Sequence, residues 1–133
     1  MKSAIVLFAA TAIQQGGILG LTLPIDWERL MPLPYVNQPV VTTQMSRFVA
    51  EEMAYSKCPM PPRRDGHRRV SVDIAVLLST DGTVRATIPR AIGCSAVEQY
   101  SAGLVSTFAR NNLTSDSSAP GGWYRANVTY EWQ

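Results

Sequence analysis

The sequence predicts an α+β domain in which two helices pack on one face of a three-stranded antiparallel sheet. Three segments with strictly alternating apolar residues predict the strands, and two segments with apolar residues at helical spacing predict the helices. Their order along the chain is helix, strand, strand, helix, strand. A length of 133 residues, with 46% hydrophobic and 17% charged residues, suits one small folded domain. We place this domain at residues 42–133.

The N-terminus has the features of a secretory signal peptide over residues 1–12. Lys2 precedes a short apolar run that ends in an Ala-x-Ala pattern at Ala12. One alternative is an uncleaved anchor, because residues 3–23 are just long enough to cross a bilayer. A buried N-terminal element of a cytosolic domain is the other alternative. We expect export to the periplasm, with the anchor alternative leaving the chain attached to the inner membrane.

Residues 13–41 are expected to form a tether. Prolines at positions 24, 32, 34 and 39 cut its second half into pieces too short for a stable helix. Four larger side chains in it could still dock on the domain: Trp27, Leu30, Met31 and Tyr35. Such a segment is more often mobile than packed.

The first predicted helix covers about residues 44–57, with Thr42 or Thr43 as its N-cap. Its expected buried stripe contains Met45, Phe48, Val49 and Met53. The second predicted helix begins at a capping box formed by Ser95 and Glu98 and runs to about Asn111. Its expected core stripe contains Val97, Tyr100, Leu104, Val105 and Phe108.

The first predicted strand covers about residues 70–79, where Ala75 and Leu77 make the second face apolar as well. This strand should therefore be central in the sheet. A turn at residues 79–82 leads into the second strand, over residues 83–88. The last strand, over residues 123–132, has the most regular alternation in the chain.

The last strand is expected to lie at an edge of the sheet and to be a docking edge for a partner. Its alternation predicts that one set of side chains faces the helices and the other lies on the open face: Trp123, Arg125, Asn127, Thr129 and Glu131. The strand has no proline and only two charges, so its edge is poorly protected against pairing. In the alternative, residues 24–39 or a dimer mate cover the edge, with Trp27 and Tyr35 as the covering side chains.

The cysteines Cys58 and Cys94 are expected to form a disulfide, because an oxidising compartment lets an even pair persist. The alternative is a pair of small buried thiols. We expect no metal and no cofactor. Neither cysteine lies in a CxxC motif, and His67 is the chain's one histidine.

The balance of 12 Lys and Arg against 10 Asp and Glu leaves a formal net charge of +2, which argues against a nucleic-acid partner. The one charge run, at residues 63–69, could contact an anionic lipid, glycan or nucleic acid through Arg63, Arg64, Arg68 and Arg69. A solvated loop is favoured, because no aromatic residue is interleaved with the arginines.

Residues 55–132 resemble the C-terminal domain of the TonB energy-transducer family. The resemblance includes a proline-containing entry, a first strand that ends in the Asp81-Gly82 turn, the sequence Gly-Cys-Ser-Ala-Val-Glu at residues 93–98, and an aromatic-rich closing strand. It implies a periplasmic domain that takes hold of an extended segment of an outer-membrane transporter, which pairs with an exposed sheet edge. It also implies a link to outer-membrane transport.

We therefore expect a non-enzymatic envelope module that captures a partner segment by β-strand addition. The alternative is a structural or accessory envelope protein that self-associates, as a homodimer, through the same edge. An enzyme is disfavoured, because His67 lies in the arginine-rich loop. Neither Asp73 nor Asp81 has a carboxylate neighbour in sequence for acid–base chemistry.

Overall fold

The computed structural model describes residues 24–114 and 122–133. The elements in chain order are η1 (Trp27–Arg29), β1 (Met31–Pro32), α2 (Thr43–Tyr55), β2 (Arg68–Leu78), β3 (Val84–Pro89), α3 (Ser95–Ala109) and β4 (Trp123–Trp132). The expected signal peptide at 1–12 and the alternative anchor at 3–23 lie outside the described residues. Within the described ranges, no helix has the length and apolar character needed to cross a membrane.

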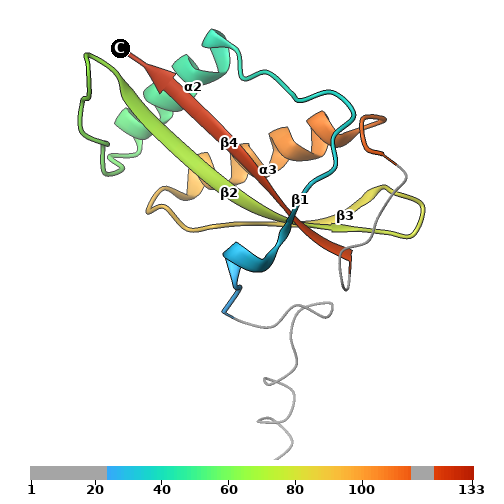
Figure 1. The fold of residues 1–133 in the computed structure, drawn as a ribbon. Helices are drawn as coiled ribbons and strands as arrows, with labels where there is room; N and C mark the ends of the chain where they lie inside the picture. Colours follow the sequence, from blue (N-terminus) through green and yellow to red (C-terminus); the bar gives the residue numbers. More distant parts are fainter. Residues whose placement is uncertain (1–23, 115–121) are drawn as a thin grey trace, which may run out of the picture.

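The sheet has four strands in the order β1-β4-β2-β3 (Figure 1). Strand β2 pairs antiparallel with both β3 and β4, so the expectation that the first long strand is central is confirmed. Strand β1 pairs with β4 in parallel, at Met31 opposite Tyr124 and Pro32 opposite Arg125. The α+β class is confirmed, but a purely antiparallel three-stranded sheet is wrong. A two-residue strand is too short to leave an alternating signal in the sequence.

The main core lies between the two helices and one face of the sheet (Figure 1). On that face β2 contributes Val72, Ile74 and Val76, all fully buried. The expected alternation of β4 is confirmed, since its helix-facing residues join this core: Tyr124, Ala126, Val128, Tyr130 and, partly buried, Trp132. Every second side chain of β2 and β4 is buried against the helices, so this core fixes the register of the two strands.

Helix α2 begins as expected at Thr42, whose Oγ1 accepts a hydrogen bond from the amide of Met45 at 3.1 Å. Its buried residues are Ser46, Val49 and Met53. Phe48, expected in the buried stripe, is 43% exposed and instead lies against the ring of Tyr100, with 4.6 Å between centroids.

Helix α3 begins one residue earlier than the expected capping box. The N-cap is Cys94, not Ser95, and its side chain makes no capping hydrogen bond. Glu98 still reaches back, since its Oε2 accepts from the amides of Ile92 at 2.8 Å and Cys94 at 3.2 Å. Val97 and Val105 are fully buried as expected, whereas the other expected stripe residues are only partly buried: Tyr100, Leu104 and Phe108.

The described part of the expected tether packs against the domain. Ile25, Trp27 and Leu30 lie against a second apolar cluster, formed by Ala75, Leu77 and Trp123 on the sheet face away from the helices. We call residues 25–33 the strap, because this segment runs from that face, along the β4 edge as β1, to Leu33 in the main core. Proline excluded a long helix here, but it did not prevent packing.

The Cys58–Cys94 disulfide is confirmed, with a Cα–Cα distance of 5.4 Å and a sequence separation of 36 residues. It joins the exit of α2 to the entry of α3. Cys94 is buried and belongs to the main core. The two helices are thereby linked covalently on the face of the sheet that they cover.

Candidate functional site

The backbone of β4 presents hydrogen-bonding groups on the side away from β2. Two contacts define this side: the amide of Leu33 donates to the carbonyl of Arg125 at 2.8 Å, and the amide of Glu131 donates to Ser46 Oγ at 3.1 Å. In a strand, the N–H and C=O groups of every second residue point to the same side. The backbone groups of Asn127 and Thr129 therefore point outward as well.

We call the outward backbone groups of Asn127 and Thr129 the open edge. Across the described ranges, no backbone hydrogen bond on this side joins either residue to another strand or loop. The open edge is bounded at Arg125 by the strap and at Glu131 by helix α2. Six residue steps separate these limits, or about 20 Å along the strand, which is room for an added strand of four or five residues.

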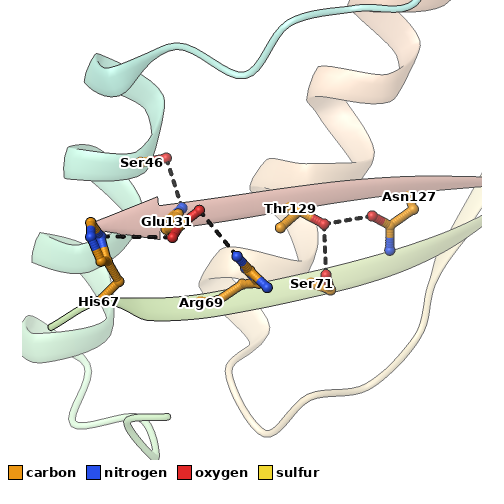
Figure 2. Close-up of polar contacts among 7 residues, drawn as sticks. All are labelled: Ser46, His67, Arg69, Ser71, Asn127, Thr129 and Glu131. Atoms are coloured by element: carbon orange, nitrogen blue, oxygen red, sulfur yellow. Dashed lines mark hydrogen bonds and ion pairs between the residues drawn. The ribbon is translucent and has the colours of Figure 1, made fainter. Parts of the chain in front are cut away.

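A row of side-chain contacts on the open face holds β4 to β2 beside the open edge (Figure 2). Thr129 Oγ1 donates to Asn127 Oδ1 at 2.7 Å. Because a hydroxyl has one proton, Ser71 Oγ must donate to Thr129 Oγ1 at 2.6 Å. Asn127 Nδ2 donates to Asp73 Oδ1 at 2.9 Å. These side chains satisfy one another, so the open edge offers mainly backbone groups to a partner.

The row ends in a cluster of charges where β4 ends (Figure 2). Glu131 lies 3.4 Å from Arg69 and 3.7 Å from His67 Nδ1, measured from its two carboxylate oxygens. A hollow of about 660 Å³ lies beside this cluster, lined by residues of α2, including Arg47 and Glu51, and by His67 and Glu131. Exposed pairs of this kind contribute little to stability.

The five residues expected on the docking edge do not have one environment. Trp123 is buried beneath the strap, at 3% exposure, and Arg125 is held by the strap through its carbonyl and its guanidinium. The expectation of a free edge along the whole strand is therefore wrong for its first three residues. Asn127 and Glu131 are exposed, and Thr129 is half-buried.

The arginines of the expected anionic contact are largely engaged within the loop and the sheet. Arg63 Nη1 donates to the carbonyl of Gly66 at 3.2 Å, and Arg68 Nη1 donates to the carbonyl of Pro61. Arg69 pairs with Glu131. Arg64 lines a hollow of about 620 Å³, and the acidic residues Asp65 and Glu131 line it as well. Anion binding by this loop remains a prediction.

The residues weighed for acid–base chemistry are placed in structural contacts. Asp73 accepts from Arg90 Nη1 at 3.3 Å. Hydrogen bonds from the hydroxyls of Ser79 and Thr83 and from the Thr83 amide hold the pKa of Asp81 below its usual value, which suits a carboxylate that organises the β2–β3 turn. In the described ranges, no group of three or more His, Cys, Asp or Glu side chains is placed to hold a metal.

Ser46 and Leu33 bound the open edge, and neither was expected to do so. Ser46 is 5% exposed and interrupts the apolar stripe of α2. A serine in that stripe was the one sign in the sequence of a buried polar contact, because buried hydroxyls are hydrogen-bonded. Leu33 is 4% exposed, between two prolines in a segment expected to be a tether. Only the folded arrangement brings both residues to β4.

No protein-family model matches this chain, and searches of curated proteins and of solved structures also found no match.

Proposed function

We propose that this chain is a non-enzymatic binding module of the cell envelope that captures an extended segment of a partner protein by β-strand addition. The site is the open edge of β4, at Asn127 and Thr129. In this mode, backbone hydrogen bonds supply affinity and the alternate side chains of the segment supply selectivity. The predicted export and the resemblance to the TonB C-terminal domain support a periplasmic setting and a segment of an outer-membrane transporter as the partner.

The proposal rests on the outward direction of the β4 backbone groups between Arg125 and Glu131. The amide and carbonyl of Asn127 and Thr129 point outward, while their side chains are already bonded within the sheet. Charged residues, prolines or bulges usually protect such an edge. Here neither outward residue is charged or a proline, and β4 pairs with β2 without a register shift.

The limits of the open edge favour a short foreign segment over a second copy of β4. Suppose that two copies paired their β4 strands antiparallel, with the two-fold axis at Val128. Arg125 of one copy would then lie opposite Glu131 of the other. In each copy Leu33 already lies beside Arg125, and Ser46 already lies beside Glu131. Two copies would therefore bring the strap of one against α2 of the other. A short peptide carries no such neighbours.

The test is selection of peptides from a random library on the immobilised full chain, followed by affinity measurement on variants. Thr129→Pro removes the outward amide without removing a backbone hydrogen bond to β2, so the variant should fold and should lose binding by at least about tenfold. Thr129→Ala is the matched control, because it removes the hydroxyl contacts but keeps the amide. It should bind nearly as the wild type does.

Equal affinity of the folded Thr129→Pro variant and the wild type would refute the open edge as the site. Failure of any peptide to enrich would also count against the proposal. A concentration-dependent dimer that Thr129→Pro abolishes would instead support the self-associating alternative.

A further inference from the structure

The strap covers the part of β4 that adjoins the open edge, and its backbone pairing with β4 is short. Strand β1 is short and makes two residue pairs with β4, at Met31 and Pro32. Both residues of β1 are exposed, with Met31 at 41%. Beyond β1, the amide of Leu33 donates to the carbonyl of Arg125 at 2.8 Å.

The rest of the strap is held through Arg125 and a small apolar cluster. Arg125 Nη1 donates to the carbonyl of Trp27 at 3.0 Å and lies 3.9 Å from Glu28, whose side chain is 84% exposed. The guanidinium of Arg90 also lies over the ring of Trp27, with 5.4 Å between Arg90 Cζ and the ring centroid. Trp27 and Leu30 are only partly buried against Ala75, Leu77 and Trp123.

Release of the strap would extend the recognition surface directly from the open edge. The outward backbone groups of Arg125 would join those of Asn127 and Thr129, so the free edge would lengthen from two outward residues to at least three. On the open face, the cluster around Trp123 would lose its cover. The surface would then combine a backbone edge with an adjoining apolar patch.

We propose that the strap is the intramolecular occupant of a binding surface that a partner segment of similar chemistry takes over. This inference rests on the proposed function. The occupant that fits is a segment with an aromatic residue followed by aliphatic residues three and six positions later, matching Trp27, Leu30 and Leu33. It also carries an acidic residue after the aromatic one, which pairs with Arg125 as Glu28 does. The partner and the strap compete for the same surface.

The test uses a fluorescently labelled synthetic peptide of residues 24–36 and the full chain. In the wild type the strap occupies the surface. The apparent affinity for the peptide is therefore low, because only a small fraction of the molecules is open at any time. In the double variant Trp27→Ala/Leu30→Ala, the peptide should bind at least about tenfold more tightly, as measured by fluorescence anisotropy. Met31→Ala is the matched control, because Met31 is exposed and contributes little to docking of the strap.

A second variant keeps the test decisive if the double variant is poorly folded. Glu28→Arg places like charges at the Arg125 contact without touching the core, and it should also strengthen peptide binding relative to the wild type. A peptide of the same composition in scrambled order should not bind any variant.

Failure of the peptide to bind either folded variant would overturn the inference. Formation of a dimer by the wild type through exchanged straps would also overturn it, because the occupant would then be a second copy. Neither result decides the open-edge proposal, which depends on Thr129→Pro and not on the strap.

Discussion

Reduction of the Cys58–Cys94 disulfide should lower the free energy of unfolding by about 4 kcal/mol. The bond closes a loop with a sequence separation of 36 residues. In the chain-entropy model, a loop of this length removes about 13 cal/mol/K from the unfolded chain, or about 4 kcal/mol at 25 °C. For a domain of this size the loss corresponds to a Tm decrease of roughly 15 to 20 °C. Reduction leaves the volume of the buried Cys94 side chain nearly unchanged.

The assay is thermal and urea unfolding of the wild type with and without reductant, followed by circular dichroism. The double variant Cys58→Ala/Cys94→Ala is the control, since reductant should not change its stability. A change below about 1 kcal/mol in the wild type, with complete reduction verified by thiol titration, would refute the loop-closure reasoning.

Three further variants test the packing and the helix and turn geometry. Tyr130→Phe removes a fully buried hydroxyl and should cost about 1 kcal/mol in urea unfolding at neutral pH. Burial raises the pKa of Tyr130 from 10.0 to about 12. Because the unfolded chain loses this proton at a lower pH than the folded protein, wild-type stability should fall as the pH rises from 10.0 through about 12. The stability of Tyr130→Phe should fall less steeply over this range. Tyr35 has a pKa raised in the same way and should contribute equally to both proteins. Thr42→Ala removes the cap of α2 and should lower stability by about 1 kcal/mol, with unchanged stability counting against the capping contact. Gly122→Ala should destabilise the entry to β4, because Gly122 has φ +78° and an added Cβ would lie 3.0 Å from the Leu78 carbonyl oxygen; an unchanged Tm would contradict this geometry.

The long strands could be predicted from sequence because each buries one face against the helices. Strict alternation in β4 gave its bounds, Trp123–Trp132, and the faces of its side chains. The apolar second face at Ala75 and Leu77 gave the central place of β2. These are local patterns that the burial of a strand face imposes on the sequence.

The packing of the strap could not be predicted in the same way. Trp27 was considered as a cover for the β4 edge, but it lies on the open face beside Arg90. Tyr35, the other considered cover, forms a bridge to Leu113 instead. Nothing periodic marks either contact, because both join segments far apart in sequence. The limits of the candidate site depend on such contacts, so the sequence predicted the strand but overestimated the length of its free edge.

Amide hydrogen exchange by NMR tests the open edge most directly. In the free chain, the amides of Asn127 and Thr129 should exchange much faster than those of Val128 and Tyr130, which point toward β2. The Glu131 amide, bonded to Ser46, should be protected. On addition of a selected peptide, the two fast amides should become slow. Slow exchange at Asn127 and Thr129 in the free chain, or no change on peptide binding, would contradict β-strand addition at this edge.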